Sequence, residues 1–227
     1  MRRLLFPIII GLGGIAILLS LAVWQLNRLD WKEGVLADIE AKLAEPAIPL
    51  PADPDPETDN YRTVIFEGRP MGSEIRFLNS GTAAGTGHQI ITRFETTDGR
   101  FILVDLGLQP LNDEAAQSAP RLMDTVTIEG NLLWPDDGNY EPANGNEFFG
   151  RRVQTMAVFL GTEPIYVVLS RASEYDPRTT PLPVDTRNIK NDHLEYAITW
   201  ILLAVVWGAM TLFYVVRGMR AGKDQTT

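Results

Sequence analysis

Two long uncharged stretches dominate the pattern of hydrophobic and polar positions along the chain. Residues 6–24 are 19 consecutive residues without a charged side chain, and residues 196–216 are a further 21. A helix rises about 1.5 Å per residue, so each stretch can cross a hydrocarbon layer of roughly 30 Å. The pattern therefore predicts a transmembrane helix in each stretch and excludes a purely soluble protein.

The charged side chains are distributed unevenly around these stretches. Residues 25–195 carry 28 acidic side chains against 15 basic ones, and basic residues flank the outer ends of the two stretches: Arg2, Arg3, Arg217, Arg220 and Lys223. Because cytoplasmic flanks are enriched in Lys and Arg, we expect residues 1–5 and 217–227 to lie in the cytoplasm. Residues 25–195 then form an extracytoplasmic domain of a multi-pass protein in the cell inner (plasma) membrane, periplasmic in a Gram-negative bacterium.

Composition excludes several kinds of site and partner. The chain has no cysteine, which excludes disulfides, Cys-based zinc or iron–sulfur sites and thiol catalysis. The acidic central domain argues against nucleic acid as a partner. A cleaved signal peptide is the alternative at the N-terminus. We favour an uncleaved anchor, because the apolar stretch is longer than a usual signal and no small-x-small cleavage site follows it.

The central domain begins with a helix and then changes to short strands. Apolar residues at helical spacing extend the first helix to about Glu45, and five prolines in residues 45–58 predict an extended spacer. Asp98 and Gly99 predict a tight hairpin turn, because such turns need a positive φ. Short apolar runs between turn residues predict strands at 62–67, 75–78, 88–95, 100–106, 125–133 and 165–169.

One short helix and two loops interrupt the predicted strands. Residues 151–160 space their apolar side chains along one helical face and end at Gly161, which predicts a helix packed on the sheet. Surface loops are expected at 136–146 and 176–183. The predicted fold class is a membrane protein in which two transmembrane α-helices flank an α+β, mainly antiparallel β extracytoplasmic domain.

The candidate chemistry centres on His193, where the second transmembrane helix begins. Tyr196 and Trp200 follow at helical spacing, and Trp24 and Arg28 lie at the end of the first transmembrane helix, at the same membrane surface. A haem would find here an imidazole for its iron, aromatic walls, and Arg28, Lys32 or Lys190 for its propionates. We therefore hypothesise that His193, Tyr196, Trp200, Trp24 and Arg28 bind a haem, with His193 as the metal ligand.

A purely structural explanation of the same residues stays open. Trp and Tyr are enriched at membrane interfaces, and a His in that region can be merely a polar residue at a helix end. Arg28 can extend its charged group to the interface while its stem lies along lipid. The other histidine, His88, is expected to be an ordinary strand or turn residue.

The residues around His193 also carry a resemblance to a known family. The segment NDHLEYAITW at residues 191–200 closely resembles the N-x-H-L-x-Y-x-x-T-W signature of the surfeit-locus-one family of cytochrome oxidase assembly factors (Shy-type). Other matches fall in the family's order, among them Trp24-Gln25 with Arg28. Two elements depart from the pattern: residues 105–108, where the family usually has Asn-Arg-Gly and an aromatic, and residues 148–151, where it usually has Trp-x-x-Asp.

This resemblance implies a non-enzymatic assembly factor that helps mature subunit I of a haem-copper (cytochrome c) oxidase. It implies haem a as a transient cofactor with His193 as the candidate ligand. The implied partners are subunit I, its assembly intermediates, the lipid bilayer and haem a synthase. A cofactor-free membrane scaffold that stabilises an oxidase assembly intermediate is the alternative. A membrane-tethered enzyme that uses carboxylates of the central domain is a third hypothesis, which no motif supports.

Overall fold

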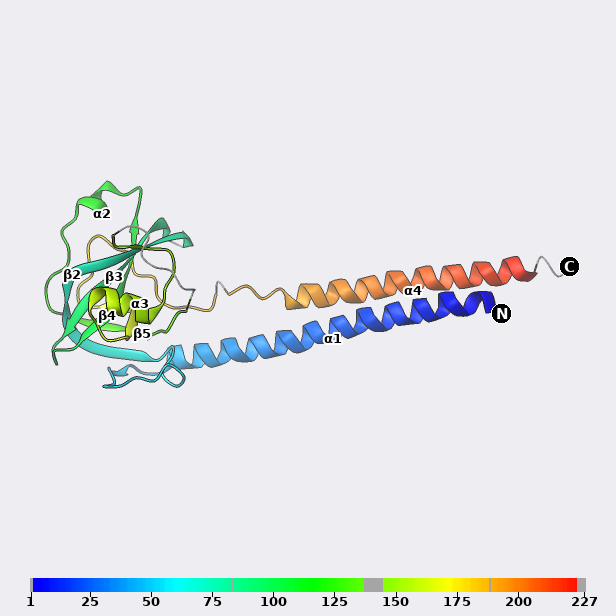
Figure 1. Ribbon diagram of the computed structural model, residues 1–227, viewed down its shortest axis with the longest axis horizontal. Helices are drawn as coiled ribbons and strands as arrows, with labels where there is room; N and C mark the ends of the chain where they lie inside the picture. Colours follow the sequence, from blue (N-terminus) through cyan, green and yellow to red (C-terminus); the bar gives the residue numbers. More distant parts are fainter. Residues whose placement is uncertain (1, 83, 137–144, 188, 224–227) are drawn as a thin grey trace. The chain divides into compact units, whose positions relative to one another are not determined.

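The chain folds into two units, a pair of long helices and a β-sheet domain (Figure 1). The computed structural model describes residues 2–82, 84–136, 145–187 and 189–223. One unit comprises Met1–Asp38 and Arg187–Thr227, and the other comprises Ile39–Thr186.

The first unit consists of α1 (Arg2–Ala44) and α4 (His193–Lys223), except that the last turns of α1 belong to the second unit. Figure 1 shows the start of α1 beside the end of α4, so the helices run antiparallel. Leu5–Ala44 and His193–Arg220 are long and apolar enough to cross a membrane. Many of their Leu, Ile, Val and Phe side chains are exposed, as expected of helices that face lipid. Both predicted apolar helices are confirmed.

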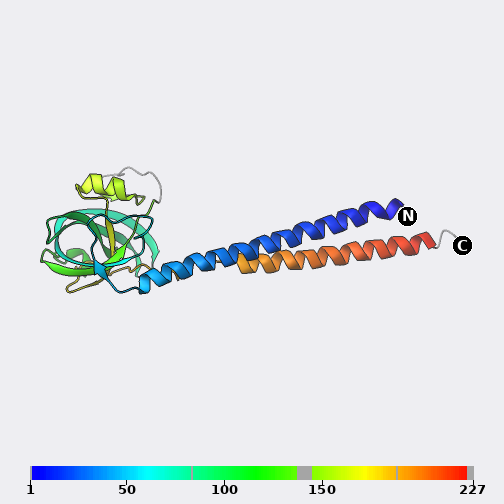
Figure 2. The same ribbon diagram turned by 90° about the horizontal axis from the view of Figure 1, so that it is seen from below.

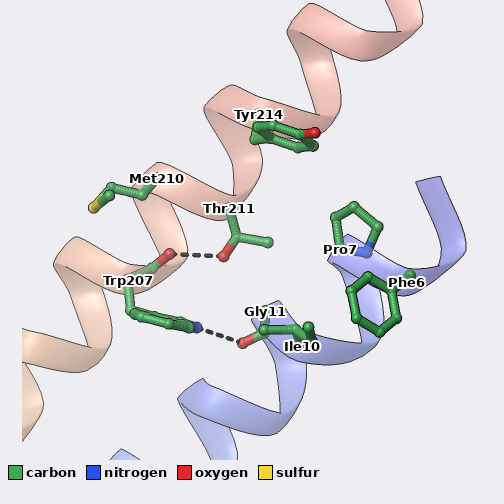
Figure 3. A pocket seen from close by; sticks show the side chains of 8 residues that line it. All are labelled: Phe6, Pro7, Ile10, Gly11, Trp207, Met210, Thr211 and Tyr214. Atoms are coloured by element: carbon green, nitrogen blue, oxygen red, sulfur yellow. Dashed lines mark hydrogen bonds between the residues drawn. The ribbon is translucent and has the colours of Figure 1, made fainter. Parts of the chain in front are cut away.

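Small residues allow α1 and α4 to approach closely. Ala22 of α1 and Ala197 and Ala204 of α4 are buried in this otherwise exposed pair. Nearer the other end, Trp207 Nε1 donates a hydrogen bond of 3.1 Å to the backbone carbonyl of Gly11 (Figure 3). In a membrane, two helices gain little from hydrophobic burial against each other, so close packing of this kind and polar contacts would hold this pair together.

Gly11→Leu is predicted to disrupt the helix pair. A Cβ on Gly11 would lie 2.1 Å from Thr211 Cγ2, whereas a Cβ on Gly13 would meet no atom within 4 Å. We expect Gly11→Leu to destabilise the pair by about 1–3 kcal/mol, the usual cost of overpacking, and Gly13→Leu to leave it unchanged. The reporter is disulfide formation between Ile15→Cys and Gly208→Cys in membranes, in a chain otherwise free of cysteine. Equal cross-linking in both leucine variants would contradict the packing.

Five strands of the second unit close into a barrel (Figure 2). In order around the ring they are β2 (Thr63–Thr82), β3 (Gly85–Thr96), β4 (Phe101–Pro110), β7 (Tyr166–Ala172) and β5 (Val126–Leu132). The ring closes because the first residues of β2 pair with β5, whereas the rest of β2 pairs with β3. The β4–β7 pair is parallel and the other four pairs of the ring are antiparallel. Two short strands, β1 (Ile48–Pro49) and β6 (Glu147–Phe148), pair in parallel with β2.

Apolar clusters cover both faces of the barrel wall. Ile102, Val104 and Leu106 of β4 belong to one buried cluster, while Leu103 belongs to a second that includes α3 (Val153–Leu160). A strand covered on both faces is apolar at successive positions instead of alternating. This double coverage explains the continuous apolar run in β4. A further short helix, α2 (Glu114–Ser118), follows β4.

Most of the predicted strands and the predicted helix are confirmed. The predicted hairpin joins β3 to β4, with Glu95 opposite Phe101 and Gly99 at φ 85°. α3 ends at Gly161, whose φ of 64° suits a residue without a side chain. The strands predicted at 62–67 and 75–78 are instead parts of the single strand β2, which continues through an irregularity in its pairing with β3.

Two predicted irregular segments are more structured than expected. The predicted spacer at 45–58 contains β1 and is fastened to the barrel, because Arg100 Nη1 donates to the Pro51 carbonyl at 2.8 Å. The predicted surface loop at 176–183 buries Asp176 and Arg178. Both corrections arise from long-range polar contacts, which local composition does not encode. Most of the loop predicted at 136–146 lies outside the described residues.

A buried carboxylate lies in the segment that departs from the family pattern. Asp105 accepts hydrogen bonds from the Tyr166 hydroxyl at 2.7 Å, from the Gly107 amide at 2.9 Å and from the side chain of Gln89. Burial raises the pKa of Asp105, although these hydrogen bonds oppose the shift. Asp105 therefore links β3, β4 and β7 through one side chain, at an electrostatic cost.

Asp105→Asn is predicted to flatten the pH dependence of stability. Because folding raises the pKa of this carboxyl, the folded protein holds its proton more tightly than the unfolded chain. The carboxyl therefore lowers the free energy of unfolding as pH rises above about 4, and an amide does not. In urea titrations the variant should gain stability relative to the wild-type protein between about pH 4 and about pH 7. Exposed Asp124→Asn is the control, and an identical pH dependence in the wild-type protein and Asp105→Asn would contradict this explanation.

Candidate functional site

His193 is the first residue of α4, and Gln25 of α1 holds its ring. The distance from His193 Nδ1 to Gln25 Oε1 is 2.8 Å. An amide oxygen only accepts hydrogen bonds, so Nδ1 is the donor, and a neutral ring then presents a free lone pair at Nε2. Gln25 is only 9% exposed, which fixes the acceptor in place. Proteins orient metal-binding histidines in this way, with one ring nitrogen held and the other left free.

The helix contact continues from His193 toward Trp200. Ala22 and Ala197, each about one turn from the hydrogen-bonded pair, are buried. Trp200, two turns along α4, is half-buried, and its buried Nε1 has no hydrogen-bond partner within the described ranges. A buried indole N–H without an acceptor is a donor that a bound ligand can satisfy.

The other two aromatic residues predicted for the site lie outside the helix contact. Tyr196 is 54% exposed and Trp24 is 57% exposed. Helical spacing puts both Tyr196 and Ala197 near His193, but Ala197 is the buried one. The exposed rings of Tyr196 and Trp24 fit an interfacial aromatic belt as well as the outer side of a ligand.

The cations near the site already have partners within this unit. The Arg28 guanidinium stacks on the Trp31 ring at 3.8 Å from the centroid. Lys32 donates to the backbone carbonyl of Lys190, and Lys190 Nζ lies 2.5 Å from Asp192. An exposed cation–π contact is worth only about 0.5–1 kcal/mol. Arg28 can therefore turn toward an anionic ligand at small cost.

Gln25 is the site residue that the sequence patterns left without a role. Its one sequence signal is its place in the Trp24-Gln25 match, three residues before Arg28. The side chain that it contacts lies 168 positions away. Only the antiparallel packing of α1 and α4 reveals this pair.

The second histidine, His88, lies in strand β3, as expected. Its Nδ1 accepts a hydrogen bond of 3.0 Å from Arg76 Nη2. Burial, together with the positive charge of Arg76, lowers the pKa of His88. Within the part of the chain that the structure describes, no group of three or more His, Asp or Glu side chains forms a metal-binding cluster. A metal bound at His193 would therefore have this histidine as a single protein ligand.

Comparison with known proteins shows the family. The model of the SURF1 family matches residues 12–205. The chain is 27% identical to Surfeit locus protein 1 of Homo sapiens, over 88% of this chain and 74% of the human protein. It is 27% identical to a SURF1-like protein of Rickettsia felis, over 88% of this chain and 91% of that protein. With a SURF1-like protein of Rickettsia bellii the identity is 29%, over 83% and 82% of the two chains.

The match covers the whole barrel and much of both long helices, and it includes Gln25, His193 and Trp200. The chain belongs to the SURF1 family.

Proposed function

We propose that this protein is a membrane-anchored assembly factor for the haem-copper cytochrome c oxidase, which aids the maturation of subunit I by holding haem a at His193. Membership of the SURF1 family supports the assembly role. The observation that carries the haem assignment is the hydrogen bond from His193 Nδ1 to Gln25 Oε1, since it leaves Nε2 free as a metal ligand. This function requires no catalytic residue.

Each residue of the proposed site has a separate task. Gln25 fixes the orientation of the imidazole, and His193 Nε2 provides the ligand atom. Trp200 Nε1 donates to a polar group of the cargo, because this N–H has no hydrogen-bond partner among the described residues. Arg28 pairs with a carboxylate, and exposed Tyr196 and Trp24 offer rings to the outer side. A bound haem supplies the iron centre that the mature oxidase uses for electron transfer.

The geometry around His193 suits temporary holding and transfer. The ring lies at the first turn of α4 and is only partly buried. A carrier must release its cargo. A cargo held by one imidazole at an open surface has fewer interactions to break on release than a cargo held in an enclosed cavity. The proposed recipients and donors are subunit I, its assembly intermediates and haem a synthase.

The proposed topology has both termini in the cytoplasm and the barrel in the periplasm. Basic residues at the outer ends of the two helices and the acidic central domain support this orientation. Two helices that are long and apolar enough to cross the membrane support anchoring at both ends of the barrel domain.

A cofactor-free scaffold is the second candidate function, and the exposure of the aromatic rings favours it. Tyr196, Trp24 and Trp31 are all more than half exposed. Rings in such positions set the depth of a helix in the membrane without binding a cofactor. In this alternative the protein stabilises an oxidase assembly intermediate through contacts of its helices and barrel alone.

His193→Ala is predicted to remove bound haem. The full-length protein, purified in detergent from cells that make haem a, should show a haem absorption band that this variant loses. Gln25→Leu should weaken haem binding by about 10–100-fold, the usual effect of removing the partner that orients a ligand. His88→Ala is the matched control, because it removes the other histidine and should keep the band. A band that persists in His193→Ala would reject the ligand assignment and favour the scaffold.

Protease added outside the cell is predicted to reach the chain before α4. Arg187 and Lys190 are exposed in this segment and are trypsin sites. Trypsin added to intact spheroplasts should cleave there, while an epitope fused after Thr227 stays protected until the cells are lysed. Protection of the segment together with an accessible epitope would reverse the proposed topology.

A further inference from the structure

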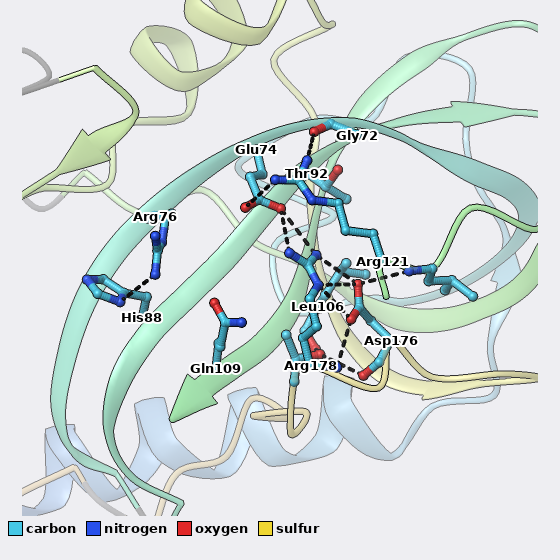
Figure 4. A network of polar contacts seen from close by, with 12 residues as sticks. Gly72, Glu74, Arg76, His88, Thr92, Leu106, Gln109, Arg121, Asp176 and Arg178 are labelled. Atoms are coloured by element: carbon cyan, nitrogen blue, oxygen red, sulfur yellow. Dashed lines mark hydrogen bonds and ion pairs between the residues drawn. The ribbon is translucent and has the colours of Figure 1, made fainter. Parts of the chain in front are cut away.

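The barrel domain contains a polar cavity that the proposed function does not use. It has a volume of about 260 Å³. Its walls come from β2, β4, the α2 region and the segment after β7 (Figure 4), and they include Glu74, Arg76, Gln109, Arg121 and Arg178. Three guanidinium groups therefore face a wall with a single carboxylate. A cavity of this composition favours an anion.

Two of the three arginines are neutralised by carboxylates. Arg178 donates to Asp176 at 2.9 Å and to Glu74 at 3.2 Å. Arg121 Nη1 donates to the Gly72 carbonyl at 2.5 Å, and its Nη2 lies 3.4 Å from Glu74. Glu74 is shared between the two guanidinium groups, and Asp176 is taken by Arg178. These two carboxylates leave no negative charge for a third cation.

Arg76 is the third cation, and it forms no ion pair with any described residue. Its guanidinium donates to His88 Nδ1 at 3.0 Å, and an imidazole that accepts a hydrogen bond there carries no charge on that nitrogen. Its Nε is buried, with no hydrogen-bond partner in the part of the chain that the structure describes. Among the described residues, no carboxylate lies within ion-pair distance of Arg76, including Glu147, its neighbour in register on β6.

Other arginines with a buried, unpartnered Nε have compensating contacts. Arg62 forms an ion pair with Glu45 at 3.9 Å. Arg93 stacks on Phe101 at 3.9 Å and donates to a backbone carbonyl. Arg76 combines the unpartnered Nε with a place in the wall of a cavity. A partly buried cation without an ion pair is costly, and a bound anion would reduce that cost.

We propose that the cavity bounded by Arg76, Gln109, Arg121 and Arg178 binds a small oxyanion, a molecule that carries carboxylate or phosphate groups. A guanidinium offers a planar fork of N–H donors that matches both groups. Arg76 provides a guanidinium that is in no ion pair with a described residue, and Arg121 provides a half-exposed second donor at the same cavity. The site lies entirely within the barrel domain and does not depend on haem binding.

The test is calorimetric titration of the full-length protein in detergent micelles with citrate and with inorganic phosphate, at constant ionic strength. We expect saturable binding of at least one of them, with Kd in the millimolar range or below. Arg76→Gln should weaken binding by about tenfold or more, as expected for loss of a charge-assisted contact. Arg76→Lys, which keeps the charge but not the fork, should recover part of the affinity.

Arg69→Gln is the matched control, because Arg69 lies on the same strand but pairs with Glu95 at 2.9 Å, away from the cavity. It should leave the affinity unchanged. If Arg76→Gln does not fold by circular dichroism, Arg121→Gln replaces it and should also weaken binding. Citrate preferred over phosphate identifies a carboxylate ligand, and the reverse identifies a phosphate ligand. Absence of binding for both probes, or equal affinity in Arg76→Gln and Arg69→Gln, overturns the proposal.

Discussion

The close approach of α1 and α4 is the constraint on which the candidate site depends. Both helices expose apolar side chains around most of their circumference, so burial against each other gives little advantage over lipid. Alanines and glycines on the contact bring the two backbones together, and polar groups then meet across it. Trp207 bonds to the carbonyl of Gly11 at one end, and His193 bonds to Gln25 at the other. The orientation of the imidazole is thus a consequence of helix packing.

In the barrel domain the main constraint is the closure of the sheet. Five strands form a ring in which neither β2 nor β5 is a free edge. Apolar residues cover both faces of its wall, and two polar side chains of the domain differ in how well they are hydrogen-bonded. Asp105 is saturated by hydrogen bonds from three neighbours, whereas Arg76 keeps an unpartnered nitrogen beside a cavity. Asp105 joins three strands through its hydrogen bonds at an electrostatic cost, whereas the unpartnered nitrogen of Arg76 is better explained by a ligand.

The sequence predicted the structural features that residues close together in the chain determine. The apolar runs, the Asp98-Gly99 turn and the helix end at Gly161 are local signals, and the structure confirms them. It did not predict the fusion of two strands into β2 or the parallel pairing of β4 with β7, since these depend on partners distant in the chain. The same limit applies to the site. Helical spacing puts Tyr196 and Ala197 equally near His193, and only the partner helix decides which one is buried.

The family signature includes His193, and the packing of α1 on α4 holds the ring of this histidine against Gln25. The most direct test is resonance Raman spectroscopy of the ferrous haem complex of the full-length protein, with and without ¹⁵N-labelled histidine. We predict an iron–histidine band that shifts on labelling and moves to lower frequency in Gln25→Leu, because loss of the acceptor makes the imidazole a weaker donor. A labelled band with the same frequency in Gln25→Leu, or no histidine-dependent band, would contradict the assignment of His193 as a ligand oriented by Gln25.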